Sequence, residues 1–401
     1  MLNDNKTILV TGAKGFLGRE IAKRLFASGH KLKLLIRNNG CSAGSVEDFI
    51  RDGDTDEAIN ESFLNNVEII EGNITSELLG LDEDDYYRLC SETDEVFHCA
   101  AVTNFESQRD DELMMVNVGG TENLLRFANT SRKVKFHYIS TAYVSGRQDG
   151  VVCEEEIDKE PQFNNKYERS KYIAEKTVIK YTKENTVPFT IYRPSIIVGD
   201  SRTGFTRKYD NLYLFAKILH NIKIRHINHQ RGDFIGYEED TYSNGPDTDI
   251  TIRVPGNPDA PINLVPIDYV ADAIVAISGQ GETVDSIFHI ANPNPPQLEE
   301  LRDIFTSVLD IKGVNLSIEG EIERKQLSAI EKLFLRRTRT YYSYLFSKLH
   351  FDCRNTQNAL DGTGISCPAI TTDLVKLLMD YAISNSWKET KPIPLQKVEI
   401  C

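Results

Sequence analysis

The sequence lacks several features that mark membrane, secreted or nucleic-acid-binding proteins. Its seven cysteines are scattered and include no CxxC pair, which predicts reduced thiols in place of a disulfide framework. No apolar run is long enough to cross a bilayer, and the opening residues MLNDNK lack the apolar stretch of a signal peptide. Lys and Arg number 46 against 60 Asp and Glu, so the formal net charge of −14 argues against nucleic acid as a partner. We therefore expect a soluble cytoplasmic protein with no transmembrane segment.

Metal-binding and repeat patterns are missing as well. The eight histidines show no spacing typical of a metal site, so we expect no bound metal. His137 and His289 fall in apolar segments that predict strands, and we expect both to pack in the core. The chain has no internal repeats. At 401 residues it is long enough to bury a sizeable core in one or two domains.

What the sequence does contain is an alternation of apolar strands with amphipathic helices. Strands are predicted at 7–13, 31–38, 67–74, 94–101, 134–141 and 188–195, and helices at 19–28, 114–131 and 167–184. The run 262–278 predicts a further strand-like element, and the acidic residues 41–65 predict a solvated insertion. This alternation indicates an α/β fold built on a doubly wound parallel sheet.

The stretch ILVTGAKGFLGRE, residues 8–20, places three glycines between the first predicted strand and the first predicted helix. Gly12, Gly15 and Gly18 would let the backbone turn sharply and approach a pyrophosphate, which a Cβ atom would block. The helix that follows presents free N–H groups and its positive dipole end to that anion. Strand, glycine loop, helix and second strand in this order predict a dinucleotide-binding Rossmann fold.

Two basic residues indicate which dinucleotide binds. Arg37 stands at the end of the second predicted strand, where an NAD-specific fold carries Asp or Glu on the ribose. A guanidinium there suits a 2′-phosphate, and Lys14 adds a second positive charge within the glycine loop. A solvated strand end is the alternative interpretation of Arg37. Together the pair favours NADP(H) over NAD(H) as the cofactor.

A hydroxyl, a tyrosine and a lysine predict carbonyl chemistry. Tyr167 and Lys171 are four residues apart on a predicted helix, so both side chains leave the same face. A neighbouring ammonium lowers the pKa of a tyrosine, which is otherwise about 10 and too high for acid–base work at neutral pH. YISTAYVSG ends a predicted strand with Ser140 and Thr141, and a hydroxyl there can hydrogen-bond a carbonyl oxygen. We choose Thr141 by counting back from Gly146.

These motifs together resemble the extended short-chain dehydrogenase/reductase family over roughly residues 6 to 290. TGAKGFLG, GNI after the third predicted strand, HCAAVTNF after the fourth, STAYVSG, the YxxxK pair and YRPS follow the family's order and spacing. The resemblance implies that Tyr167 is the catalytic acid–base, Lys171 its pKa modulator and ribose ligand, and Thr141 the catalytic hydroxyl. It places Asn117 where the family carries an asparagine that supports the active site, and helix packing or capping is an equal interpretation.

The same resemblance implies a set of cofactor contacts and a division into domains. The implied contacts are Gly12, Lys14, Gly15, Phe16, Leu17, Gly18, Arg37, Asn73, Ile74, Ala100, Ala101, Tyr167, Lys171, Pro194 and Ile197. The family usually has Asp at the position of Asn73, but an amide carbonyl can still pair with the adenine amino group. We expect residues 1–200 with about 262–292 to form the NADP-binding domain. Residues 201–261 and 293–401 would form a smaller, discontinuous, mainly helical substrate domain.

The stretch TIYRPSIIVGDSRTGFT, residues 190–206, is similar to thioester reductases and to the male-sterility or fatty acyl reductase group. GFLG in the glycine loop and the late FDCRNTQNALDGTGISCP also look like that group. This branch implies hydride transfer from NADPH to the carbonyl carbon of an acyl thioester, with Tyr167 and Thr141 stabilising the oxyanion. Collapse of the hemithioacetal would release thiol and aldehyde. A second hydride could carry the aldehyde to an alcohol.

Basic residues in the predicted substrate domain raise the question of a phosphate-bearing substrate. They are Lys217, Lys223, Arg225, Arg231, Arg336, Arg337 and Arg339. They could bind the phosphopantetheine phosphate of coenzyme A or of an acyl carrier protein, but a solvated helix face is the favoured interpretation. The aromatic run YYSYLF, residues 341–346, predicts core with some contact to an acyl pocket. A homodimer is compatible with the sequence.

Two other classes of function fit parts of the pattern. NLVPIDYVADAI and FHIANPNP also occur in hydroxysteroid dehydrogenases and in nucleotide-sugar epimerases or dehydratases. The cofactor that copurifies would separate those enzymes from an NADPH-dependent reductase. A non-catalytic NADP-binding sensor is the second alternative. Such proteins tend to lose the tyrosine, whereas Thr141, Tyr167 and Lys171 are all present here.

Overall fold

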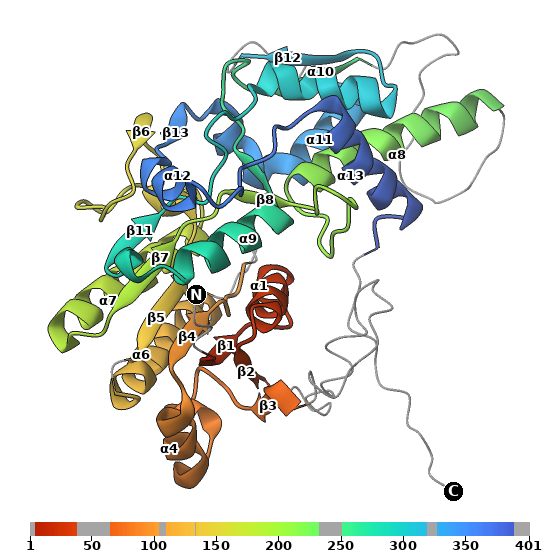
Figure 1. Cartoon of the computed structure of the whole chain (residues 1–401). Helices are drawn as coiled ribbons and strands as arrows, with labels where there is room; N and C mark the ends of the chain where they lie inside the picture. Colours follow the sequence, from red (N-terminus) through yellow and green to blue (C-terminus); the bar gives the residue numbers. More distant parts are fainter. Residues whose placement is uncertain are drawn as a thin grey trace, which may run out of the picture.

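The computed structural model of this protein describes residues 5–37, 65–103, 110–132, 134–231, 251–318 and 327–388. Its centre is a sheet of seven strands covered by helices (Figure 1). In spatial order the strands are β11 (Ser286–Phe288), β7 (Phe189–Tyr192), β5 (Lys135–Ile139), β4 (Glu95–His98), β1 (Thr7–Thr11), β2 (Lys31–Ile36) and β3 (Val67–Glu71). All neighbours in this sheet pair in parallel, which confirms the predicted doubly wound α/β fold.

The two faces of the sheet pack under different helices. In β1, Ile8 and Val10 join a first core with α1 (Phe16–Ala27) and α9 (Ile267–Ser278). Leu9, between them, joins a second core. The helices over that core are α4 (Glu83–Glu92), α6 (Gly120–Thr130) and α7 (Lys166–Asn185). Successive side chains of a strand point to opposite faces, so a strand covered on both sides must be apolar throughout.

A third core contains four further helices, at the top of the view in Figure 1. They are α8 (Leu212–Arg231), α10 (Leu298–Leu309), α11 (Ala329–Thr338) and α13 (Thr372–Ser384). Short parallel strand pairs also occur: β8 (Ile196–Val198) with β10 (Leu264–Pro266), β9 (Ile252–Pro255) with β12 (Val314–Ser317), and β6 (Gly150–Val152) with β13 (Leu349–Phe351). The boundaries of two domains stay a prediction.

The run 262–278 differs from the strand-like element that was expected. Only β10 is a strand, and from Ile267 the chain forms α9. Nine of the twelve residues of this helix are buried, and the run from residue 262 is nearly continuously apolar, a pattern that buried strands and buried helices share. The expected insertion at 41–65 lies outside the described residues except for residue 65.

Candidate active site

The strand order reverses between β1 and β4, and the glycine loop lies at this point. From β1 the chain proceeds to β2 and β3 on one side and then crosses to β4 and β5 on the other. In doubly wound sheets a ligand binds in the crevice at such a reversal, beyond the carboxyl ends of the strands. Gly12 directly follows β1, and Cys99 directly follows β4. The fold therefore places the loop where a dinucleotide binds.

Close backbone contacts require glycine in this loop. Gly12 has a φ of +73°, and a Cβ atom there would lie 2.6 Å from the Ala100 nitrogen. A Cβ atom on Gly18 would overlap the Gly12 carbonyl oxygen. The Gly15 amide donates to the same carbonyl at 2.8 Å and closes the turn. The result is an open cradle at the N-terminus of α1, the kind of site that binds phosphate.

One cavity of about 850 Å³, here called the tyrosine cavity, joins this loop to the residues predicted for catalysis. The predicted residues on its wall are Gly12, Gly15, Phe16, Leu17, Gly18, Ala101, Thr141, Tyr167, Lys171, Pro194 and Ile197. Much of the remaining wall comes from apolar side chains of the third core, among them Phe215, Leu301 and Phe334. The cavity thus offers a loop for a dinucleotide and an apolar surface in the same space.

Other predicted cofactor contacts do not lie on the wall of the tyrosine cavity. They are Lys14, Arg37, Asn73, Ile74 and Ala100. Lys14 and Arg37 are exposed. The Asn73 Oδ1 accepts hydrogen bonds from the Thr75 amide at 3.1 Å and from the Thr75 hydroxyl at 2.9 Å, so it is engaged by its own turn. Contacts of these residues with adenine or a 2′-phosphate stay predictions.

Lys171 is buried at the carboxyl end of β5. Its Nζ donates a hydrogen bond of 2.6 Å to the Ile139 carbonyl and lies 4.2 Å from the centroid of the Tyr138 ring. Burial lowers the pKa of Lys171 to about 7, although the nearby Glu175 carboxylate acts in the opposite direction. The side chain can therefore change its charge close to neutral pH.

The pKa of Tyr167 differs from the lowering that the YxxxK spacing predicts. Burial raises the pKa of this phenol above its ordinary value, and the Glu168 carboxylate raises it further. Burial is the larger of the two causes, and the Lys171 ammonium is bound to the Ile139 carbonyl. A phenol with a raised pKa stays protonated at neutral pH and can donate a proton.

Hydroxyl groups follow β5 on the wall of the tyrosine cavity. The Thr141 Oγ1 accepts from the Tyr143 amide at 3.3 Å and donates to the Pro194 carbonyl at 3.5 Å, both weak contacts. Within the described residues, the buried hydroxyl oxygens of Ser140 and Ser195 have no hydrogen-bond partner. Buried polar groups are normally satisfied, so these hydroxyls fit a site that holds a polar ligand.

Asn117 connects two segments behind the cavity wall. It lies in the π-helical turn η2 (Met115–Gly119) between α5 (Asp110–Met114) and α6, and it is 1% exposed. Its Oδ1 accepts from the Val102 amide at 2.8 Å, and its Nδ2 donates to Ser170 Oγ at 2.9 Å. Ser170 donates in turn to the Tyr167 carbonyl at 2.8 Å. Asn117 therefore ties the loop after β4 to the helix of Tyr167 and does not line the cavity itself.

Sequence reasoning missed a link between α7 and the C-terminal region. Glu168 is fully buried and accepts hydrogen bonds from the Asn164 amide at 2.8 Å and from the Tyr344 hydroxyl. Asn165 Nδ2 also donates to the Tyr344 oxygen, at 2.8 Å. Asn165 and Glu168 are a readable capping pattern at the start of the helix. The tyrosine is 176 residues away from Glu168 and leaves no local pattern.

The lysines considered for a phosphate site have protein partners instead. Lys217 donates to the Trp387 carbonyl at 3.4 Å. Lys223 forms an ion pair of 3.0 Å with Asp310. Neither lysine lines the tyrosine cavity. Among the basic residues considered for this site, Arg225 and Arg231 have side chains outside the described part of the chain.

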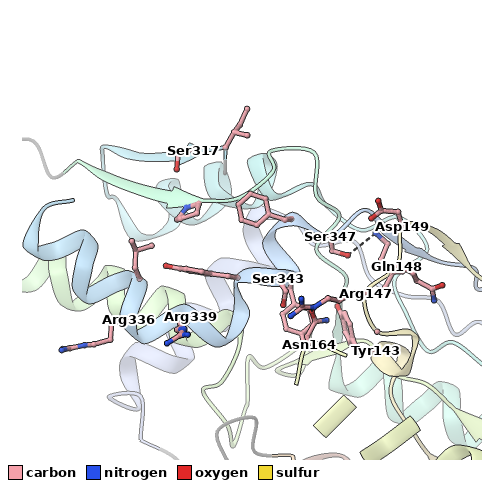
Figure 2. Close-up of a pocket in the computed structure, with 18 of the residues that line it drawn as sticks. Tyr143, Arg147, Gln148, Asp149, Asn164, Ser317, Arg336, Arg339, Ser343 and Ser347 are labelled. Atoms are coloured by element: carbon pink, nitrogen blue, oxygen red, sulfur yellow. Dashed lines mark hydrogen bonds between the residues drawn. The ribbon is translucent and has the colours of Figure 1, made fainter. Parts of the chain in front are cut away.

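The arginines of α11 and of the following 3₁₀ segment η6 (Arg339–Phe346) face two different cavities. Arg337 lines the tyrosine cavity. Arg336 and Arg339 line a neighbouring cavity of about 1130 Å³, here called the basic cavity (Figure 2). In the aromatic run 341–346, Leu345 packs in the third core and Tyr344 lines both cavities. The run therefore contributes to core and to pocket.

The histidines that were expected in the core lie there. His137 is fully buried and stacks on Phe97 with ring centroids 4.2 Å apart, and His289 is also fully buried. Within the described ranges, His, Cys, Asp and Glu form no group of three or more that could hold a metal ion. Among the helices that the structure describes, none has the length and apolar character needed to span a bilayer.

Known proteins are similar to this chain in sequence and in fold. A linear gramicidin synthase protein of Brevibacillus parabrevis is 24% identical over 389 residues, a match that covers 93% of this chain and 7% of that protein. The chain spans only a small part of the curated relatives that it matches. The terminal R domain of the myxalamid PKS-NRPS biosynthetic pathway has a TM-score of 0.75 at 24% identity, covering 97% of this chain and 93% of that one. A thiolation-reductase di-domain from an archaeal non-ribosomal peptide synthetase has a TM-score of 0.72 at 22% identity, covering 96% and 76%.

The family described as "Male sterility protein", an NAD-binding family, matches residues 10–274. That range contains the glycine loop, Thr141, Tyr167 and Lys171. The match confirms the predicted resemblance and a nicotinamide dinucleotide as the class of cofactor. The chain therefore belongs to the male sterility protein family, a branch of the extended short-chain dehydrogenase/reductase oxidoreductases.

Proposed function

We propose that this protein is an NADPH-dependent reductase that acts on the carbonyl group of an acyl thioester. The observation that carries the proposal is the tyrosine cavity, because the glycine loop, Thr141, Tyr167, Lys171 and the apolar wall of the third core all line it. A cofactor at the loop and an acyl group against the apolar wall would meet at Tyr167. Family membership supports the same class of reaction.

The cofactor would lie along the loop, with its pyrophosphate at the N-terminus of α1. The unpartnered hydroxyls of Ser140 and Ser195 support a polar ligand in this cavity. Lys14 and Arg37 would supply positive charge to a 2′-phosphate, which favours NADP(H) over NAD(H). The reduced nicotinamide, when bound, supplies a hydride. Further contacts are assigned by family resemblance to Phe16, Leu17, Asn73, Ile74, Ala100, Ala101, Pro194 and Ile197.

We assign Tyr167 as the proton donor to the carbonyl oxygen. Burial and Glu168 raise the pKa of the phenol, so it carries its proton at the pH at which reduction requires one. Thr141 would donate a hydrogen bond to the same oxygen and stabilise the charge that develops there. Lys171, when protonated, supplies positive charge that favours the transient phenolate. Asn117 is a positioning residue, because it acts on Tyr167 through Ser170.

Release of the product needs no further residue. Once the carbonyl carbon has gained a hydride, proton donation by Tyr167 to the oxygen would leave a hemithioacetal, whose hydroxyl would face the Tyr167 phenolate. The phenolate takes that proton back, the carbon–sulfur bond breaks, and the thiolate takes a proton from solvent. The products are an aldehyde and a free thiol, and Tyr167 is protonated again.

The relatives support a thioester held on a carrier protein, and coenzyme A is the second thioester source that the proposal includes. The gramicidin synthase protein and the R domain named above belong to peptide and polyketide assembly systems, and the archaeal relative joins a reductase to a thiolation domain. The apolar side chains of the third core would bind the acyl chain. A carbonyl compound such as an aldehyde or ketone is the related substrate class for the same residues.

The Tyr167→Phe substitution tests the assignment. We expect turnover to fall by about 10²- to 10⁴-fold, the usual contribution of a positioned general acid. NADPH binding, followed by fluorescence titration, should stay near the wild-type value. Tyr181→Phe is the matched control, because Tyr181 lies on the same helix and does not line the tyrosine cavity. Comparable turnover in Tyr167→Phe and wild type would contradict the mechanism.

A further inference from the structure

The basic cavity carries an excess of positive charge. The charged residues on its wall are Arg147, Lys332, Arg336 and Arg339, opposed by Asp149 as the acidic residue among the lining that the structure describes. Four cations face one carboxylate in a chain whose formal net charge is −14. A positively charged recess on an otherwise acidic protein attracts anions.

The cations stand on two sides of this cavity. Figure 2 shows Arg336 and Arg339 on the helical side and Arg147, next to Asn164, on the opposite side. Arg147 is exposed, and its Nε donates to Asn164 Oδ1 at 2.9 Å, which orients the guanidinium. Arginines therefore line this cavity at two separate places.

The charges of Arg336 and Arg339 are not neutralised within the described part of the chain, where neither forms an ion pair. Arg302 in the tyrosine cavity differs, because it pairs with Glu299 at 3.2 Å and with Asp303 at 2.7 Å. Guanidinium groups without a carboxylate partner are free to bind two oxygens of a phosphate. Arg337 of the tyrosine cavity also has no ion pair among the described residues, but that cavity has two carboxylates on its wall, Glu168 and Asp210, against one in the basic cavity. The basic cavity therefore has the larger excess of positive charge.

The basic cavity and the tyrosine cavity share part of their wall. Tyr143, Tyr344, Ser347 and Leu349 line both. Tyr143 and Tyr344 pack edge to face with ring centroids 5.2 Å apart. A long ligand that passes this pair could place an anion in the basic cavity and a reacting group in the tyrosine cavity.

We propose that the basic cavity binds the phosphate of a 4′-phosphopantetheine arm whose thioester enters the tyrosine cavity. This inference rests on the proposed thioester reduction and adds a second, distant anchor for the substrate. The arm has the two ends that the cavities require, a phosphate and a thioester joined by a chain with amide groups. Ser343, Ser347 and Asn164 on the wall can hydrogen-bond such amides. Coenzyme A and a carrier protein both present this arm.

Binding of unacylated ligands tests the site. Isothermal titration calorimetry would compare 4′-phosphopantetheine with pantetheine, which has the same chain and no phosphate. We expect wild-type protein to bind 4′-phosphopantetheine about tenfold or more tightly, with a difference that shrinks as salt rises. The Arg336→Ala/Arg339→Ala double variant should lose most of this preference. Lys180→Ala, which removes an exposed cation from α7, should retain it in full.

Equal affinity of the wild-type protein for the two ligands would overturn the proposal, and so would a full preference in the double variant. Arg147→Ala, on the opposite side of the cavity, should reduce the preference independently. NADPH affinity measured on each variant shows that the protein is folded. Both arginines of the double variant are exposed, so their removal leaves the core intact.

Coenzyme A, titrated in parallel, separates the two sources of the arm. Tighter binding than 4′-phosphopantetheine would show that the protein also binds the nucleotide of coenzyme A, whereas equal or weaker binding would show that the nucleotide adds nothing and would favour the arm of a carrier protein. These ligands carry no acyl group, so the measurement does not depend on turnover. Phosphate preference without thioester reduction would refute the proposed function and support the anion site. Thioester reduction without phosphate preference would support the proposed function and refute the anion site.

Discussion

The Tyr344→Phe substitution removes the oxygen atom that joins η6 to the helix of Tyr167. The Tyr344 hydroxyl donates to the Glu168 carboxylate and accepts from Asn165 Nδ2 at 2.8 Å. Phenylalanine keeps the edge-to-face packing against Tyr143, so the variant tests the hydroxyl alone. The expected consequence is a looser contact between α7 and the C-terminal region.

The size of the effect follows from the burial of Glu168. A hydrogen bond to a charged group contributes about 1.5–3 kcal/mol, and a buried partner left without its donor costs about 1–3 kcal/mol more. Glu168 keeps two donors from Asn164, at 2.8 and 3.2 Å, so the low end of the sum applies. We expect the free energy of unfolding to fall by about 2–3 kcal/mol.

The loss should depend on pH with a definite sign. Burial raises the pKa of Glu168, while the Tyr344 hydroxyl opposes this shift. Removal of the hydroxyl raises the folded-state pKa further. The variant therefore loses stability, relative to wild type, as pH rises through the pKa of Glu168, because the ionised carboxylate is the form that needs the donor.

Urea unfolding of matched variants at several pH values checks this prediction. Tyr342→Phe, in the same segment, removes a hydroxyl that meets no carboxylate among the described residues and should cost less than about 1 kcal/mol. Equal losses for Tyr344→Phe and Tyr342→Phe would refute the reasoning. So would a Tyr344→Phe loss that does not change with pH.

Three further substitutions or profiles test the site. Asn117→Ala removes the hydrogen bonds that hold α7 against the loop after β4, so unfolding free energy should fall by about 2–4 kcal/mol. Steady-state kinetics should show that kcat falls more than the affinity for NADPH. An unchanged kcat would show that Asn117 does not position Tyr167. The kcat/KM should decrease as pH rises through about 7, because the lowered pKa of Lys171 means that its charge is lost there; a flat profile across neutral pH would show that this charge is not needed. Arg37→Asp should raise the KM for NADPH far more than the KM for NADH, and equal effects would mean that Arg37 does not touch the 2′-phosphate.

Local sequence patterns are sufficient to predict much of the fold and part of the site. The glycine loop, the YxxxK pair and the hydroxyls after β5 are each encoded within a few neighbouring residues, and the fold brings them to one cavity. Six of the seven strands of the central sheet lie within the predicted apolar runs, and β11 is the strand that the predicted ranges do not include. In contrast, α9 was expected as a strand-like element, because a nearly continuous apolar run is shared by buried strands and buried helices.

The electrostatics of the site could not be predicted from spacing. The distance of four residues between Tyr167 and Lys171 predicts a lowered phenol pKa, but burial raises it, and burial depends on segments far away in the chain. The basic cavity could not be predicted from local patterns either, because Arg147 lies about 190 residues from Arg336 in the sequence. The sequence also grouped Lys217 with the arginines, although its ammonium is bonded to the Trp387 carbonyl.

The central claim is best tested by measuring NADPH oxidation with a panel of acyl-coenzyme A and acyl-4′-phosphopantetheine thioesters, matching free aldehydes and simple ketones. The account predicts turnover with a thioester, with free thiol appearing as NADPH is consumed, and loss of both signals in Tyr167→Phe. Turnover of aldehydes or ketones alone, with no thiol released from any thioester, would contradict it. The protein would then be a carbonyl reductase of the same fold.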